Sequence, residues 1–267
     1  MRAVVKIGGA QLGEAQARAR LAQAVASAQE RGHEVILVHG GGDQIRALTP
    51  RLGLTDRYHE GLRITDAATA EVALMVLGGQ VNRWLVHALQ GAGIDAVGIT
   101  GADGDSFRAR PLQNAGVDLG FVGEVSAVDA RLIEALLDTG VVPVIATVAP
   151  LDPAIAGDAS QFYNINADHA AGPLARAFAA EALLFLTDVP GVLDGDGTLI
   201  PRLTPSRCHE LRQAGVIRGG MIPKVEAAFA ALAAHPRATV KIAPAAVDGA
   251  IDNALLSTTG TTFVCDR

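Results

Sequence analysis

The strongest constraint on this chain is a regular alternation of short apolar runs with Ala- and Leu-rich segments of helical length. The apolar runs carry Val, Ile and Leu at successive positions, which is typical of parallel strands covered on both faces. The predicted strands are 3–7, 34–39, 96–100, 141–147, 182–187 and 239–242, and the predicted helices are 16–31, 67–90, 129–139 and 167–180. This order predicts an α/β fold, a three-layer αβα sandwich with a mainly parallel and open central sheet.

The domain organisation is expected to be simple. A chain of 267 residues can form one broad domain or two lobes, and no internal repeat or flexible linker marks a boundary. We therefore predict one domain over 1–267 with a soft division near residue 175. Two polar, glycine-containing stretches, 105–128 and 194–203, alternate like hairpins and are expected to attach to the main sheet.

Charge and cysteine content exclude several classes of partner. The formal net charge is −6, so the chain lacks the cationic field that binding to nucleic acid requires. Cys208 and Cys265 lie far apart, without the spacing of zinc ligands or of a disulfide framework. The sequence enters a predicted strand at once and has no run of about eighteen apolar residues. We expect a cytoplasmic protein that binds small molecules and no membrane.

Glycine turns follow the first two predicted strands. The first strand leads from Lys6 into Gly8 and Gly9, and the second leads into the triple glycine 40–42. Ligands of a parallel sheet bind beyond the carboxyl ends of its strands, where glycine lets backbone amides surround an anion. One glycine pair can be only a tight turn, but a lysine beside one pair together with a triple glycine favours anion binding. The Walker pattern and the dinucleotide fingerprint are both absent.

Lysine is rare, with three residues against nineteen arginines, so the lysines at glycine turns stand out. A compact ammonium group can contact a phosphoryl oxygen as a point charge. Lys6 ends a strand, and Lys224 follows the glycine turn 219–220 at the start of a predicted helix. Either lysine alone would be interpreted as a solvated side chain, but the pairing with glycine turns favours a phosphoryl site. Lys241 is interpreted as a sheet-edge residue.

A polar row precedes the Ala-rich helix that starts near residue 167. Asn164, Asn166 and Asp168 alternate on one side of the segment, and capping of the helix accounts for one of the three. Asp168 could hold both ammonium groups in position. Arg63, just before a Thr-Asp pair that can cap the next helix, is either a surface residue or a bidentate ligand for a carboxylate. His39 and His169 are interpreted as structural, with the alternative that either could reach the site.

A Pro-Gly turn follows the strand 182–187. The turn, 188–194, could hold an adenosine through its backbone, although Pro-Gly after a strand is also ordinary turn chemistry.

Taken together, these segments resemble the amino-acid kinase family. The similarity is collinear over essentially the whole chain. It rests on Lys6–Gly9, His39–Gly42, Gly61–Asp66, Gly120–Val125, Asn164–Asp168, Thr187–Leu193 and Gly219–Val225.

The resemblance implies phosphorylation of the side-chain carboxylate of N-acetyl-L-glutamate by MgATP, a step of arginine synthesis. It implies that 1–175, approximately, binds the acidic substrate and forms the dimer contact, and that 176–267, approximately, binds ATP. By matching position, Lys6 and Lys224 would stabilise the migrating phosphoryl group and Asp168 would orient them. Mg²⁺ would arrive bound to ATP, without metal ligands from the protein.

The resemblance also implies three groups of binding residues. The amides of Gly8, Gly9 and Gly41 would cradle the phosphoryl group. The substrate would contact Gly41, Gly42, Arg63, Asn164 and Asn166. ATP would contact Asp188, Val189, Pro190, Gly191, Val192, Leu193, Val216, Ile217 and Arg218.

Three alternatives remain open. A kinase of carrier-protein-linked aminoadipate or glutamate shares fold and reaction but needs a basic surface for its acidic carrier. An inactive amino-acid sensor on the same scaffold would not need two lysines on a phosphate. A nicotinamide oxidoreductase lacks support without its glycine fingerprint. The sequence enters its first predicted strand at residue 3, so by the same resemblance we expect this chain to lack the N-terminal helix that links dimers into hexamers in arginine-inhibited members. We expect an arginine-insensitive homodimer.

Overall fold

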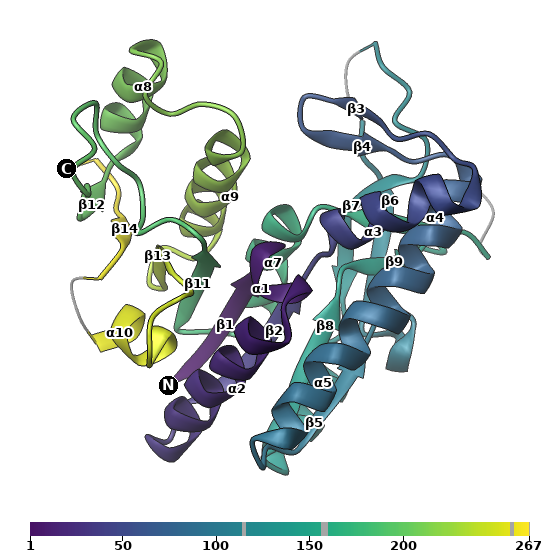
Figure 1. Ribbon diagram of the computed structural model, residues 1–267, viewed down its shortest axis with the longest axis horizontal. Coiled ribbons are helices and arrows are strands. Elements are labelled where there is room, and N and C mark those ends of the chain that lie inside the picture. The colour runs from purple at the N-terminus through teal and green to yellow at the C-terminus, as the bar shows by residue number, and fades with distance from the viewer. Residues whose placement is uncertain (114–115, 156–159, 257–258, 267) are drawn as a thin grey trace.

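The computed structural model describes residues 1–113, 116–155, 160–256 and 259–266, and its centre is an eight-stranded sheet (Figure 1). The strand order is β12-β14-β13-β11-β1-β2-β8-β5, and all neighbours pair in parallel except β13 and β14. The strands are β1 (Arg2–Ile7), β2 (Glu34–His39), β5 (Ala96–Ile99), β8 (Val142–Ala146), β11 (Ala182–Thr187), β12 (Arg202–Leu203), β13 (Thr239–Pro244) and β14 (Thr261–Phe263). The prediction of a mainly parallel, open sheet is confirmed.

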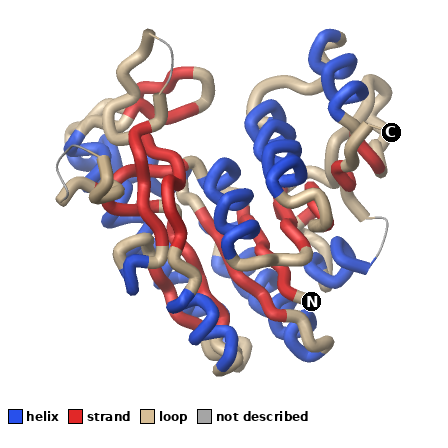
Figure 2. Tube along the Cα trace, turned by 180° about the vertical axis from the view of Figure 1, so that it is seen from behind, coloured by secondary structure: helices blue, strands red, loops and turns tan. Residues whose placement is uncertain are grey.

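Helices cover both faces of this sheet, as Figures 1 and 2 show from opposite sides. One apolar core lies between the sheet and α2 (Ala15–Glu30), α4 (Ala67–Leu74), α5 (Asn82–Gly91) and α10 (Ala250–Leu256). The other lies between the sheet and α6 (Arg131–Asp138), α7 (Ala167–Ala177), α8 (Pro205–Gln213) and α9 (Met221–Ala234). Successive residues of β1 point into different cores, Val4 into one and Val5 into the other, which explains why the strand is apolar throughout.

Smaller elements complete the strand ends. Short helices follow β1 and β2, namely α1 (Ala10–Gly13) and α3 (Gly42–Leu48), and 3₁₀ turns occupy Thr49–Leu52 and Asp103–Asp105. A hairpin of β3 (Arg57–His59) and β4 (Leu62–Ile64) projects beyond the sheet.

The stretch 105–128 departs from the prediction. Its strands β6 (Phe107–Pro111) and β7 (Val122–Val128) pair antiparallel, but they belong to a second, four-stranded sheet with β10 (Phe162–Ile165) and β9 (Val148–Pro150). Residues 114–115 of that stretch lie outside the described residues. The separation has a structural reason, because β7 pairs with β10, whose position after β9 could not be read from local patterns. The stretch 194–203 does join the main sheet, through β12.

The predicted helix 67–90 is continuously helical, with a π-helical segment at Met75–Val81 between α4 and α5. Gly78 and Gly79 lie in this segment, and their low helix propensity reduces the cost of the wider turn. The π-helical segment brings Leu77 against the triple-glycine turn, because a Cβ on Gly41 would lie 2.7 Å from Leu77 Cδ2.

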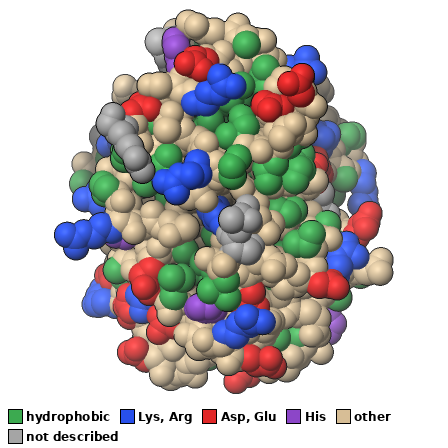
Figure 3. Space-filling view, turned by 90° about the vertical axis from the view of Figure 1, so that its left-hand side faces the viewer, with side chains coloured by type: hydrophobic (Ala, Val, Ile, Leu, Met, Phe, Trp, Pro, Cys, Tyr) green, Lys and Arg blue, Asp and Glu red, His purple; other side chains and the backbone are tan. Residues whose placement is uncertain are grey.

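The described part of the chain has no helix that is both long enough and apolar enough to cross a membrane. The face at the left of Figure 1, seen in Figure 3, carries both acidic and basic side chains, scattered around a less charged centre.

Candidate active site

Two lysines that are distant in the sequence converge on one carboxylate. Lys6 Nζ lies 2.7 Å from Asp168 Oδ1, and Lys224 Nζ lies 3.1 Å from Asp168 Oδ2. Lys6 is near the end of β1, Asp168 is in the first turn of α7, and Lys224 is in the first turn of α9. The structure therefore brings together, at the carboxyl edge of the sheet, the three residues that the sequence indicated for phosphoryl transfer.

The local sequence explains how Asp168 is placed. Asn166 is the N-cap of α7, and its Oδ1 accepts hydrogen bonds from the backbone N–H groups of Asp168, at 2.9 Å, and His169, at 3.3 Å. The cap fixes the first helical turn, where a carboxylate is also favoured by the helix dipole. Capping thus engages the Asn166 side chain, and Asn166 also lines the site together with Asn164 and Asp168.

Burial gives this cluster unusual electrostatics. Lys6 is 5% exposed and Asp168 is 7% exposed. Desolvation, with the positive charge of Lys224, lowers the pKa of Lys6 to about 8, although Asp168 acts in the opposite direction. Burial alone would raise the pKa of Asp168, but the two ammonium groups outweigh it and hold that pKa below its usual value. The carboxylate is therefore ionised at neutral pH, and Lys6 is protonated there with little margin.

A cavity of about 240 Å³ lies beside Lys6 and Asp168. Its polar wall includes the predicted substrate residues Gly41, Gly42, Arg63, Asn164 and Asn166. Its apolar wall consists of Ile7, Ile45, Leu62, Leu77, Val122 and Ile165. A small molecule with a charged end and an apolar group matches such a lining. A wider cavity of about 710 Å³ adjoins it between the β3–β4 hairpin and the start of α9.

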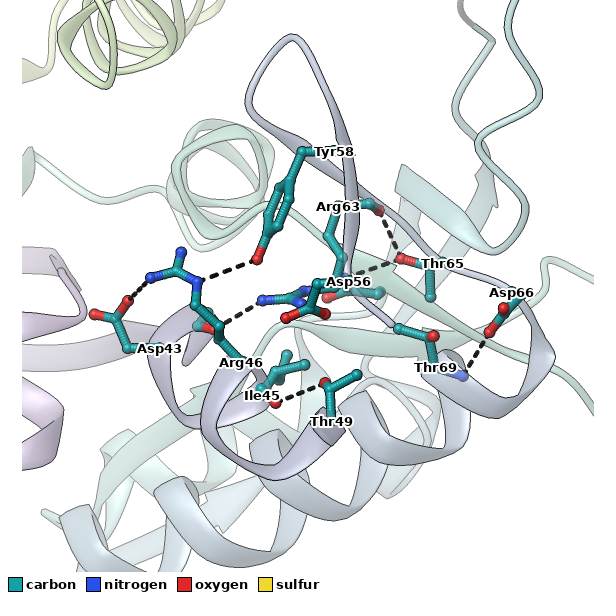
Figure 4. A network of polar contacts seen from close by, with 12 residues as sticks. Asp43, Ile45, Arg46, Thr49, Asp56, Tyr58, Arg63, Thr65, Asp66 and Thr69 are labelled. Carbon is teal, nitrogen blue, oxygen red and sulfur yellow. Dashed lines mark hydrogen bonds and ion pairs between the residues drawn. The ribbon is translucent and has the colours of Figure 1, made fainter. Parts of the chain in front are cut away.

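Arg63 is held rigidly in the wall of the smaller cavity. Its Nη1 forms an ion pair with Asp56, its Nη2 donates to the Gly42 carbonyl at 2.8 Å, and its guanidinium carbon lies 4.9 Å from the centre of the Tyr58 ring (Figure 4). Burial, with the positive charge of Arg46, lowers the pKa of Arg63 to about 10, so the group stays charged at neutral pH. Arg63 is therefore not the surface residue that was the alternative interpretation.

The glycine turns differ in what they contribute. Gly9, Gly41 and Gly42 line the cavity, whereas the Gly8 N–H donates to the Leu186 carbonyl of β11 at 3.2 Å. Gly9 leaves room for the Asp43 carboxylate, since a Cβ at Gly9 would lie 2.8 Å from Asp43 Oδ2. The two turns are thus in contact across the carboxyl ends of β1 and β2.

The predicted nucleotide segments lie together on the other side of β1. The turn 188–193 follows β11, the neighbour of β1, and the Val192 N–H donates to Thr261 Oγ1 at 2.8 Å. Val192 and Ile217 are both buried in the same apolar core, and Val216 packs against it. Their side chains are therefore occupied in packing.

Two other sequence interpretations can be compared with the structure. His39 is structural as predicted: it is fully buried, its Nδ1 bonds the Gly40 carbonyl at 2.8 Å, and burial lowers its pKa to about 4. The interpretation of Lys241 as a sheet-edge residue is wrong. Lys241 lies on β13 between β11 and β14, and its buried Nζ donates to the Ala254 carbonyl at 2.7 Å.

Four further residues that line the cavity or pair with its wall were not predicted. Leu77 enters the wall through the π-helical segment, and Asp56 pairs with Arg63. Arg46 and Tyr58 also line the cavity. Tyr58 was the one with a usable signal, because it stands opposite Arg63 in the β3–β4 hairpin and cross-strand neighbours share a face.

A parallel αβα sandwich with paired lysines and a buried carboxylate at the strand ends defines a phosphotransferase site of the amino-acid kinase type. The chain belongs to the amino acid kinase family, whose sequence profile matches residues 1–241.

Individual proteins of known sequence or structure are also similar to this chain. Acetylglutamate kinase from Acidobacterium capsulatum is 46% identical over 87% of this chain and 86% of its own length. Acetylglutamate kinase from Methanopyrus kandleri is 44% identical over 89% of this chain and 93% of its own length. The solved structure of smu.665 from Streptococcus mutans UA159 has a TM-score of 0.80 and 28% identity, covering 99% of both chains.

Proposed function

We propose that this chain is an acetylglutamate kinase, which transfers the γ-phosphoryl group of ATP to the side-chain carboxylate of N-acetyl-L-glutamate. The product is N-acetyl-L-glutamyl 5-phosphate, an intermediate of arginine biosynthesis. The observation that carries the proposal is the convergence of Lys6 and Lys224 on Asp168, beside a small cavity with a buried arginine. Relatives at 40–46% identity that bear this name support it.

The reaction needs no general base, because the acceptor carboxylate is already ionised at neutral pH. Catalysis then consists of in-line positioning and neutralisation of the charge on the transferred group. In this proposal Lys6 and Lys224 contact the phosphoryl oxygens, and Asp168 holds the two ammonium groups at one place. The burial of Lys6 and Asp168 strengthens this effect, since charges interact more strongly away from water.

The substrate occupies the cavity of about 240 Å³ with its side-chain carboxylate toward Lys6. Arg63 binds the main-chain carboxylate, Asn164 and Asn166 offer amide groups, and the apolar wall receives the acetyl methyl group. Asn164 Nδ2 is held 3.4 Å from Thr65 Oγ1, which orients the amide. The Gly9 and Gly41 amides cradle the phosphoryl group. The Gly8 amide joins them only if it releases the Leu186 carbonyl.

ATP binds on the C-terminal side, along the turn 188–193 and the segment 216–218, so that its γ-phosphate reaches Lys6 and Lys224. In this proposal the acidic substrate binds to a lobe of about 1–175 and the nucleotide binds to a lobe of about 176–267. Mg²⁺ would be held mainly by phosphate oxygens and water. Within the described residues no three His, Cys, Asp or Glu side chains are grouped as metal ligands.

The test is a hydroxylamine trap for acyl phosphate with MgATP and four acceptors: N-acetylglutamate, glutamate, aspartate and aminoadipate. Hydroxamate from N-acetylglutamate alone is expected. Product from aminoadipate instead, or from none of the acceptors, would refute the proposed function. We also propose a homodimer that L-arginine does not inhibit, to be measured by sedimentation and by the same trap with added arginine. A hexamer or strong inhibition would contradict it.

A further inference from the structure

The mouth of the substrate cavity carries a second arginine that the proposed chemistry has not used. Arg46, on α3, lines the same cavity as Arg63, and both guanidinium groups lie against the ring of Tyr58 (Figure 4). Their central carbons are 5.8 Å and 4.9 Å from the ring centre, for Arg46 and Arg63 respectively. Arg46 Nε also donates to the Tyr58 hydroxyl at 3.4 Å. One aromatic ring of the hairpin thus holds two cations at one place.

Each arginine is paired with a protein carboxylate, but the two pairs differ in exposure. The Arg63 side chain is 6% exposed and its pair with Asp56 is enclosed. The Arg46 side chain is 60% exposed, and its Nη1 contacts Asp43 Oδ1 at 2.9 Å within one helical turn. Exposed pairs of this kind contribute little stability because water and salt screen them, whereas an enclosed pair is costly to break. Arg46 can therefore exchange Asp43 for another anion at a small free-energy cost, whereas breaking the ion pair of Arg63 with Asp56 would cost much more.

Two like charges side by side are unfavourable unless an anion comes between them. The two guanidinium groups lie against the same Tyr58 ring, and the charge of Arg46 adds to burial in lowering the pKa of Arg63. Asp43 pairs with Arg46 and Asp56 pairs with Arg63, and these two carboxylates supply compensating negative charge.

We propose that Arg46 is a second carboxylate-binding residue. When the substrate enters, Arg46 breaks its ion pair with Asp43 and pairs with the main-chain carboxylate of the substrate, while the Tyr58 ring keeps the Arg46 guanidinium over the cavity. The inference rests on the proposed function, because it assumes an acceptor with two carboxylates. One of these goes to the lysines, and the other is shared by Arg46 and Arg63. Asp43 remains favourable in the first turn of α3 after the exchange, because that position faces the positive end of the helix dipole.

The test is a set of single substitutions assayed with N-acetylglutamate. Arg46→Ala is expected to raise KM by roughly tenfold or more while kcat stays within about twofold, because a charge-assisted hydrogen bond made equally in ground and transition states is lost. The KM of Arg46→Lys should lie between those of wild type and Arg46→Ala, since an ammonium group keeps the charge but lacks the planar fork of a guanidinium. The matched control is Arg57→Ala. Arg57 is on the β3–β4 hairpin next to Tyr58 and its side chain is 64% exposed, but it does not line the cavity.

The carboxylate concerned is identified with 4-acetamidobutyrate, which keeps the acetamide and the reacting carboxylate but lacks the main-chain carboxylate. Wild type and Arg46→Ala should bind this compound equally in competition with N-acetylglutamate. The inference is overturned if Arg46→Ala matches Arg57→Ala in KM, if kcat falls instead of KM rising, or if the loss persists with the analogue. A wild-type chain that does not phosphorylate N-acetylglutamate at all refutes the proposed function, which is a distinct outcome.

Discussion

Replacing Asp168 with Asn removes the charge that both lysines share while keeping the size of the side chain. Lys6 and Lys224 lie 2.7 and 3.1 Å from its carboxylate oxygens, and the side chain is 10% exposed. At an effective dielectric constant of about 20, two unit charges about 4 Å apart interact by about 4 kcal/mol. Loss of this interaction moves the pKa of Lys6 well below its present value of about 8, because desolvation and Lys224 still act on it.

The variant is expected to fold, with a stability that depends on pH more steeply than that of wild type. Removing one partner of a buried pair costs about 3–5 kcal/mol when the remaining charge persists. Here Lys6 can lose its proton instead. Folded Asp168→Asn then binds one proton fewer than the unfolded chain, so its unfolding free energy falls by about 1.4 kcal/mol per pH unit as the pH decreases.

Wild type does not show this slope below about pH 8, because Lys6 is then protonated in both folded and unfolded chains. Asp168 contributes no slope either, because its pKa is held below the usual value and it stays ionised. The difference in unfolding free energy between the two proteins should therefore grow by roughly 2–3 kcal/mol between about pH 8 and about pH 6. Urea unfolding at these two pH values measures it.

Catalysis should fail even where the fold survives. A neutral Lys6 cannot balance charge on the phosphoryl group, so kcat by the hydroxylamine trap is expected to fall by about a hundredfold or more. The control is Asp252→Asn, which also changes a buried carboxylate, one that accepts from Ser27 at 2.6 Å and pairs with Arg31 at 3.3 Å, away from the cavity. It should lower stability and leave kcat intact. A kcat for Asp168→Asn within about tenfold of wild type, or a stability loss that is the same at both pH values, refutes this reasoning.

Further predictions concern the same site. Lys6→Ala and Lys224→Ala should each lower kcat by on the order of a hundredfold with circular dichroism unchanged, and unimpaired variants would remove them from the mechanism. In wild type, kcat/KM should decline as the pH rises through about 8, because the free enzyme then loses the Lys6 ammonium; a flat profile up to about pH 9 would contradict this. Gly41→Ala should raise KM several-fold, since its Cβ would lie 2.7 Å from Leu77 Cδ2 and push that side chain toward the cavity. Gly79→Ala, which meets nothing within 4 Å, is the control, and equal KM values would exclude the contact.

Much of the fold followed from the sequence because the relevant signals are local. Strands such as β1 and β11 are short, mainly apolar runs, and each is followed directly by glycine or aspartate. The meeting of Lys6, Asp168 and Lys224 was predictable for a related reason: parallel strands bring their carboxyl ends, and the helices that follow them, to one edge.

The errors came from features that depend on distant partners. Lys241 looked like an edge residue because nothing near it reveals that β14 returns antiparallel beside β13. The strands β6 and β7 looked like an extension of the main sheet, but β10 recruits β7 into a second one. The pairing of Arg63 with Asp56 is set by the geometry of the hairpin, which residue types alone do not specify.

The charges of the site follow a gradient of exposure that matches what each has to do. Lys6 and Asp168, where our proposal places phosphoryl transfer, are buried, so rearranging them would carry a large free-energy cost. Fixed electrostatic stabilisation of a transition state requires such rigidity. Arg46 and Asp43, at the mouth, are wet and weakly bound to each other, which is what capture and release of a ligand require. Arg63 combines the two properties: it is buried like Lys6 and Asp168, but in our proposal it binds the carboxylate of the substrate that does not react. A substitution should therefore change kcat when it lies at the dry end and KM when it lies at the mouth, and the variants of Asp168 and Arg46 separate the two ends.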